Sequence, residues 1–175
     1  MNILRFLIPM LALSFLCACE EQPVKPVQPS SDRQIKESLE RANRYLANEE
    51  EEEINYYVRR HQLEMVSTGT GLRYQVLEKG EGSLVQAGQT VTMEYVLYDL
   101  TGEEIYSSEK DGLMHFLVGR SDVPSGLDEA VRLLHVGDRA CVIVPSHLGY
   151  GLLGDQNAIP SRATLIYILK IIKVE

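Results

Sequence analysis

The chain has no tryptophan, three cysteines and four histidines among 175 residues. The histidines are scattered, with no second ligand at helical or hairpin spacing, so we expect no metal site; they are His61, His115, His135 and His147. Two cysteines, Cys17 and Cys19, lie just after the N-terminal apolar stretch, and Cys141 lies much further along. If Cys17 is removed and Cys19 is acylated, Cys141 is the one thiol left, and a single thiol cannot form an internal disulfide. Its neighbours Ala140 and Val142 to Val144 are those of a buried strand, so we expect Cys141 to pack in a core and not to act as a nucleophile.

Basic residues are too few for a nucleic-acid partner. Lysine and arginine total 17 against 25 aspartates and glutamates, which gives a formal net charge of -8. Phosphate binding needs clustered Lys and Arg side chains, and the sequence has no such cluster. The acidic residues are concentrated in a run from Glu49 to Glu53, which is typical of a solvated helix face. Length and composition predict one modest globular domain with extensions.

Long apolar runs are rare, and the clearest one lies at the N-terminus. Arg5 precedes an almost wholly apolar stretch from Phe6 to Leu16, which is too short to span a hydrocarbon core of about 30 Å comfortably. A small residue, Ala18, stands directly before Cys19. This arrangement predicts that residues 1–18 are a lipoprotein signal peptide and that Cys19 is the lipidation site. An ordinary signal peptide and a hydrophobic anchor are the alternatives.

Acylation of Cys19 would determine where the protein is located. Each buried methylene of an acyl chain contributes about 0.8 kcal/mol, so several chains on one residue hold a protein on a membrane without a spanning helix. We therefore expect a protein of the bacterial cell envelope, lipid-anchored in the outer membrane, on the periplasmic or the surface face.

A spacer and a helix separate the predicted anchor from the main domain. Residues 19–31 contain Pro23, Pro26 and Pro29 and predict an extended linker. Residues 32–66 predict a helical extension, interrupted near Asn48, because apolar residues recur at three- and four-residue intervals: Ile35, Leu39, Ala42, Leu46, Ile54, Tyr57 and Val58. Such a stripe needs a partner. It packs either on its own domain or on the same helix of a second copy, and the second option predicts a homodimer.

The remaining chain, residues 67–175, predicts an α+β domain. Its β-rich runs are bounded by turn residues and alternate as in an antiparallel sheet; they are Leu72 to Leu77, Thr90 to Leu97, Met114 to Val118, Arg139 to Val144 and Thr164 to Val174. One short helix is expected from Asp128 to His135, ended by Gly137. A sheet with a single helix on one face says nothing about function by itself.

The stretch from Val144 to Thr164 is the most informative, because it places Tyr150 and Ile159 around a glycine-rich loop beside a strand. With Tyr95, Phe116, Gly119, Gly126 and Leu127 upstream, it predicts a small apolar pocket. These residues and their spacing resemble the FKBP-type peptidyl-prolyl cis-trans isomerases from about Gly69 to Glu175. The resemblance implies an antiparallel sheet wrapped on one short helix, here preceded by a helical extension, as in lipoprotein members including the gliding-motility-associated type.

The resemblance also implies roles for individual residues. The Tyr150 hydroxyl matches the one that donates a hydrogen bond to a substrate carbonyl, and Leu127 takes the place of the pocket floor. The catalytic set carried over is Tyr95, Tyr106, Phe116, Tyr150 and Ile159, and the substrate-binding set is Ile105, Val123, Leu127 and Tyr167. The expected partners are proline-containing polypeptides, and the expected activity is to assist protein folding by twisting X-Pro amides. No cofactor is expected.

Three residues depart from the family pattern. Ile105 replaces the usual aromatic residue, and Tyr106 replaces the usual aspartate. Pro124 stands where the family supplies a backbone N–H, and proline has none to donate. These departures keep a second hypothesis open, in which the domain is a weak or inactive isomerase that serves as a chaperone-like binding or scaffold module.

Overall fold

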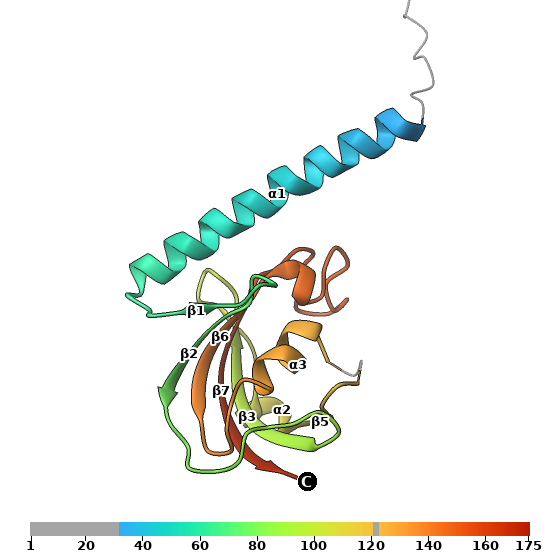
Figure 1. The fold of residues 1–175 in the computed structure, drawn as a ribbon. Coiled ribbons are helices and arrows are strands. Elements are labelled where there is room, and N and C mark those ends of the chain that lie inside the picture. Colours follow the sequence, from blue (N-terminus) through green and yellow to red (C-terminus); the bar gives the residue numbers. More distant parts are fainter. Residues whose placement is uncertain (1–31, 121–122) are drawn as a thin grey trace, which may run out of the picture.

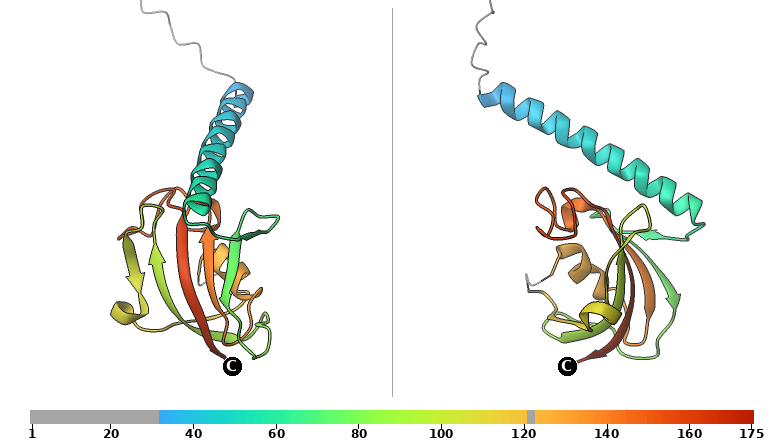
Figure 2. Two further views of the ribbon diagram at one scale, coloured as in Figure 1. Left: turned by 90° about the vertical axis from the view of Figure 1, so that its left-hand side faces the viewer. Right: turned by 180° about the vertical axis from the view of Figure 1, so that it is seen from behind.

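The computed structural model describes residues 32–120 and 123–175. The predicted signal peptide, the proline-rich linker and Cys19 lie outside the described residues. The described part of the chain begins with one long helix and continues into a curved antiparallel sheet that encloses a short helix (Figures 1 and 2). The predicted fold class is therefore confirmed.

Helix α1 spans Asp32–Arg60 without the interruption predicted near Asn48. That prediction was wrong because the glutamate run from Glu49 to Glu53 consists of strong helix formers, which carry the helix past Asn48. Arg59 and Arg60 stand in the last turn, where positive charge is favourable. The helix ends where Gln62 adopts a left-handed conformation with φ of 53°.

Within the described residues the sheet contains seven strands, and all their pairs are antiparallel. The order is β1-β2-β6-β7-β3-β4, and β5 also pairs with β3. Strand β4 and the short helix α2, Ser108–Asp111, were missed by the sequence reasoning. The strands are β1 (Val66–Ser67), β2 (Arg73–Glu78), β3 (Thr90–Tyr98), β4 (Glu104–Ser107), β5 (Met114–Leu117), β6 (Arg139–Val144) and β7 (Leu165–Val174).

Helix α3 spans Ser125–Val131 and not the predicted Asp128 to His135. Pro124 is the N-cap residue of this helix, and its carbonyl accepts the N–H groups of Leu127 and Asp128. The helix ends early because the following residues leave it to pair with residues 83–85: the N–H groups of Val85 and Val136 donate to the carbonyls of Leu134 and Ser83. Figure 2 shows α3 inside the curve of the sheet.

The two faces of the sheet carry different cores. Along β6 and β7, alternate side chains join the large inner cluster around α3 or a smaller outer cluster. The outer cluster contains Cys141, Ile143 and Ile166 and is covered by Ile54 of α1, which is 1% exposed. Burial raises the pKa of Cys141 to about 11, which keeps the thiol protonated at neutral pH.

Only part of α1 is docked on the domain. Glu50 and Ile54 are the buried residues of this helix, whereas Ile35 and Leu39 nearer its start are exposed. In Figure 1 the N-terminal half of α1 extends beyond the sheet. The apolar stripe predicted from the sequence therefore packs on the domain only in its C-terminal half.

Replacing Ile54 by alanine is expected to lower the free energy of unfolding by about 2–5 kcal/mol, because it opens a cavity between α1 and the sheet. The matched control is Leu39→Ala on the same helix, where the side chain is 58% exposed. We expect the control to change stability by no more than about 0.5 kcal/mol. Urea denaturation measures both, and equal effects would show that α1 is not docked through Ile54.

Candidate functional site

The structure brings the predicted site residues together on the inner face of the sheet. Of the nine, five are buried members of the inner cluster and three more pack against it partly buried. They come from β3, β4, β5, α3, β7 and two loops. The buried members are Tyr95, Phe116, Leu127, Ile159 and Tyr167, and the partly buried ones are Ile105, Tyr106 and Val123.

Two tyrosines form the interior of this cluster. The ring centroids of Tyr95 and Tyr167 lie 6.5 Å apart with a tilt of 46°, a favourable arrangement of aromatic pairs. Tyr167 is 1% exposed, and its burial raises its pKa far above the usual value. Burial, followed by the charge of Asp111, also raises the pKa of Tyr95. Both phenols are therefore neutral members of the apolar inner cluster.

Tyr150 lies at the rim and is the most exposed of the predicted residues, at 38%. It follows the 3-10 helix η1, Ser146–Leu148. The backbone around it is fixed, because the Gly151 N–H donates to the Ser146 carbonyl at 2.9 Å and the Arg162 N–H donates to the Gly151 carbonyl at 2.7 Å. Partial burial and the nearby Asp155 carboxylate raise the pKa of Tyr150, so its hydroxyl keeps its proton and can donate it in a hydrogen bond.

Tyr106 connects β4 to the segment between η1 and β7, residues 149–164, which carries Tyr150 and Ile159 and is called the Tyr150 loop below. Its hydroxyl donates to Asp155 Oδ2 and accepts a hydrogen bond from Asn157 Nδ2 at 2.8 Å. Asp155 Oδ1 accepts from the N–H groups of Asn157 and Ile159 at 2.9 and 2.7 Å. A carboxylate therefore stands near Tyr150 although position 106 itself has none. Asp155 and Asn157 were not predicted from the sequence. The feature that could have indicated Asp155 is the tendency of an Asp side chain to accept a hydrogen bond from the backbone N–H two residues further along.

The Tyr150 loop is expected to loosen in acid. Partial burial tends to raise the pKa of Asp155, but the Tyr106 hydroxyl and the loop N–H groups together hold it below the usual 3.8. A carboxylate with a lowered pKa contributes stability that is complete above its unfolded value and is lost as pH falls through the folded value.

An NMR pH titration that follows the Asn157 and Ile159 amide signals measures this loss. The signals should move with a midpoint below pH 3.8, and Asp155→Asn should remove the transition. A midpoint above pH 3.8 would contradict the assignment.

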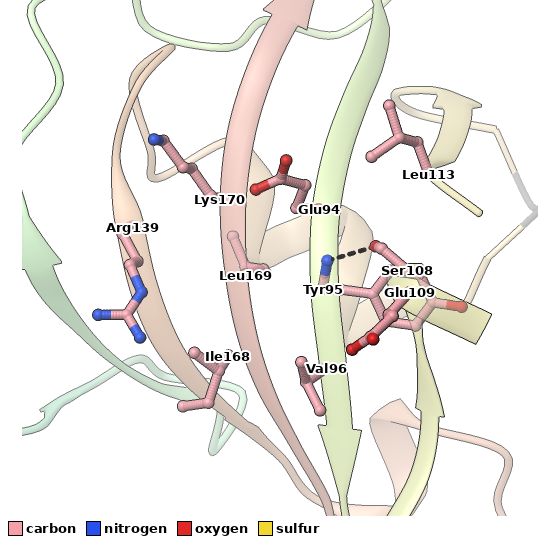
Figure 3. Close-up of a pocket in the computed structure, with 10 residues that line it drawn as sticks. All are labelled: Glu94, Tyr95, Val96, Ser108, Glu109, Leu113, Arg139, Ile168, Leu169 and Lys170. Atoms are coloured by element: carbon pink, nitrogen blue, oxygen red, sulfur yellow. Dashed lines mark hydrogen bonds between the residues drawn. The ribbon is translucent and has the colours of Figure 1, made fainter. Parts of the chain in front are cut away.

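A separate groove of about 430 Å³ lies on the outer face of the sheet (Figure 3). Glu94, Val96 and Lys170 line it, and Tyr95 contributes its backbone, whose N–H donates to Ser108 Oγ at 2.7 Å. Side chains alternate along a strand, so the Tyr95 ring points to the other face. This groove is thus distinct from the inner cluster and contains none of the other predicted residues.

The described residues contain neither a membrane-spanning helix nor a cluster of metal ligands. Among residues 32–120 and 123–175, no helix is both long and apolar enough to cross a membrane. In the same ranges, no group of three or more histidine, cysteine or acidic side chains is arranged to hold a metal ion.

The fold defines the class before any sequence comparison. The structure superposes on FkpA from Escherichia coli with a TM-score of 0.64 and 23% identity, covering 85% of this chain and 75% of that one. It superposes on AtFKBP13 with a TM-score of 0.62 and 22% identity, covering 64% and 99%. At these identities the likeness establishes an FKBP-like fold.

Sequence comparison establishes the family. The family model described as FKBP-type peptidyl-prolyl cis-trans isomerase matches residues 81–172. An FK506-binding protein of Streptomyces anulatus is 38% identical over 99 residues, which cover 55% of this chain and 80% of that protein. A probable FKBP-type isomerase, FkpA, of Neisseria meningitidis is 32% identical over 108 residues, covering 62% and 39%.

The chain belongs to the FKBP-type peptidyl-prolyl cis-trans isomerase family. Its enzyme class is therefore that of the peptidyl-prolyl isomerases, as the sequence predicted. The lipoprotein and gliding-motility subtype stays a prediction.

Proposed function

We propose that the inner cluster beneath Tyr150 is the site where X-Pro peptide bonds isomerise. The observation that carries this proposal is the convergence of eight predicted residues in one cluster, with the Tyr150 hydroxyl at its rim. These residues come from elements that are far apart in the sequence. Ordinary core packing accounts for Leu127 and Tyr167 singly, but it gives no reason for Tyr150, a tyrosine that is 38% exposed, to stand next to Tyr95 and Tyr167.

The chemistry needs little more than such an enclosure. Rotation about an X-Pro bond faces a barrier of about 18–20 kcal/mol, because the amide loses resonance as it twists. The planar amide has the more polarised carbonyl, so withdrawing it from water penalises the ground state more than the twisted transition state. The result is catalysis by differential binding, without a nucleophile, a metal or a general base.

Individual residues would divide this task. Phe116, Ile159 and Tyr167 would enclose the proline ring, while the Tyr150 hydroxyl donates to a substrate carbonyl. Ile105, Val123 and Leu127 would complete the apolar wall. Tyr106 would hold the loop in place through Asp155, so its contribution is indirect.

Tyr150→Phe is expected to lower kcat/KM about 2- to 10-fold, the effect of one lost hydrogen bond worth about 0.5–1.5 kcal/mol. Exchange NMR of a short X-Pro peptide measures the rate. The matched control is Tyr56→Phe on α1, an exposed tyrosine away from the cluster, which should leave the rate unchanged. A folded Tyr150→Phe variant with the wild-type rate would remove Tyr150 from the site.

A second candidate function is a chaperone-like binding or scaffold module. Pro124 favours it, because this residue offers no N–H to a ligand and uses its carbonyl to accept the Leu127 and Asp128 N–H groups of α3. In that case partner binding would be indifferent to Tyr150→Phe and Phe116→Ala. A folded protein that accelerates no X-Pro peptide across several X residues would favour this module over the isomerase.

The location in the cell envelope is also a proposal. A lipid on Cys19, followed by the linker at residues 19–31, would hold the domain at a membrane and expose it to polypeptides that are folding there. Metabolic labelling with a fatty acid, followed by fractionation, tests this directly. Label that survives in Cys19→Ala, or protein that stays in the aqueous fraction, would contradict the anchor.

The exposed N-terminal half of α1 supports a homodimer. Ile35 and Leu39 lie one turn apart on this half, and both are exposed. A stripe of this kind can pair with itself in a second copy. Light scattering of the purified protein without its lipid should then give twice the monomer mass, and a monomeric mass would remove the proposal.

A further inference from the structure

A carboxylate from α1 reaches the base of the Tyr150 loop. Glu50 is 9% exposed although it lies within the acidic run that was predicted to be solvated. Its Oε1 accepts hydrogen bonds from the Ser146 N–H at 2.6 Å and from Thr164 Oγ1 at 2.6 Å, and its Oε2 accepts from Ser146 Oγ at 2.9 Å. A buried carboxylate is costly unless hydrogen-bonded, and three donors meet this one.

The positions of these donors are informative. Ser146 is the first residue of η1, immediately before the loop that carries Tyr150 and Ile159, and Thr164 directly precedes β7, where the loop ends. One carboxylate therefore joins both ends of the loop. The Ser146 carbonyl in turn accepts the N–H groups of Gly149 and Gly151, the residues on either side of Tyr150.

Glu50 differs from the other contacts that dock α1. Arg73 on β2 pairs with Glu51 and donates to Asn55 Oδ1 at 2.9 Å, and Ile54 packs in the outer cluster. Those contacts attach the helix to the sheet and do not touch the loop. If Glu50 only attached α1 to the sheet, its removal would change the isomerisation rate no more than the removal of Glu51.

We propose that Glu50 is a positioning residue, through which helix α1 holds the Tyr150 loop in the geometry that isomerisation requires. The effect on catalysis rests on the proposed function, whereas the effect on the loop does not. Helix α1 lies outside the isomerase domain, residues 67–175. Through Glu50 it would nevertheless help to hold a loop of the active site in place. The substrate need not touch Glu50.

Three variants of the full chain separate positioning from docking. Glu50→Ala removes all three acceptor contacts and is expected to lower kcat/KM for an X-Pro peptide by about 10- to 100-fold, since displacing a site by about 1 Å can cost 100-fold. Glu50→Gln should restore most of the rate, because its amide oxygen can accept from Ser146 N–H and Thr164 Oγ1 while its NH₂ donates to Ser146 Oγ. Glu51→Ala, which releases Arg73, should leave the rate near wild type.

Hydrogen exchange of the Gly149 and Gly151 amides gives a readout that does not depend on activity. In Glu50→Ala both amides should exchange about tenfold faster or more, with wild-type exchange in Glu50→Gln and Glu51→Ala. Unchanged exchange in Glu50→Ala, or equal loss of rate in Glu50→Ala and Glu51→Ala, would overturn the proposal. If the wild-type protein accelerates no peptide, the proposed function fails, and the exchange measurement still decides whether Glu50 holds the loop.

Discussion

Replacing Gly154 by alanine is expected to lower kcat/KM by about 100-fold while the rest of the domain stays folded. Gly154 has φ of +65°, and a Cβ there would lie 2.1 Å from the Ile159 carbonyl oxygen and 3.0 Å from the Pro160 carbonyl carbon. Both are backbone atoms, so the loop itself would have to move. The Asp155 N–H donates to that same carbonyl, and a shift would displace the Asp155 and Ile159 positions together.

Gly151→Ala is the matched control for the Gly154 variant. Gly151 also has positive φ, +60°, but a Cβ there meets nothing within 4 Å. It should therefore incur only the backbone strain of a left-handed alanine, about 1–2 kcal/mol, without the steric clash. Peptide isomerisation rates and thermal unfolding of both variants provide the comparison. Equal losses of rate would mean that backbone strain, and not the contact with Ile159, governs the loop.

Phe116→Ala is expected to lower both activity and stability. Phe116 lies on β5 and is 5% exposed. Truncating a buried phenylalanine lowers the free energy of unfolding by about 3–5 kcal/mol. Removing its share of the apolar enclosure, worth about 1.5–3 kcal/mol, should lower kcat/KM by about 10- to 100-fold.

Phe116→Leu separates the two effects of the alanine variant. A large aliphatic side chain keeps most of the volume, so we expect a stability loss of less than about 1.5 kcal/mol and only a partial loss of activity. Denaturation and peptide isomerisation are measured at a temperature where all variants are folded. An alanine variant that is destabilised but has the wild-type kcat/KM would place Phe116 in the core and outside the site.

Much of the sheet was predictable because its strands are β-rich runs bounded by turn residues, with burial that alternates along β3 and covers both faces of β6. The predicted runs at Thr90 to Leu97 and Arg139 to Val144 correspond closely to β3 and β6. The end of α3 could not be predicted from the sequence. Its periodic apolar residues continue towards His135, but His135 lies outside the helix and pairs with Leu84. Tertiary pairing overrode a local helical pattern there, as it often does.

The inner cluster was predictable from a resemblance, and its polar support was not. Tyr95, Phe116 and Tyr167 could be placed because the family pattern fixes their order along the chain. The partners of Tyr106 and the role of Glu50 depend on which loop lies against which element, and spacing along the chain contains no such information. Glu50 was predicted to be solvated with its neighbours, and its burial follows from the position of α1 over the end of the loop.

The location of the site is the central claim, and an NMR titration of the labelled protein with a proline-containing peptide tests it most directly. We expect amide shift changes concentrated at Tyr95, Phe116, Tyr150, Ile159 and Tyr167. Changes concentrated at Glu94, Arg139 and Lys170, around the outer groove of Figure 3, would contradict the account.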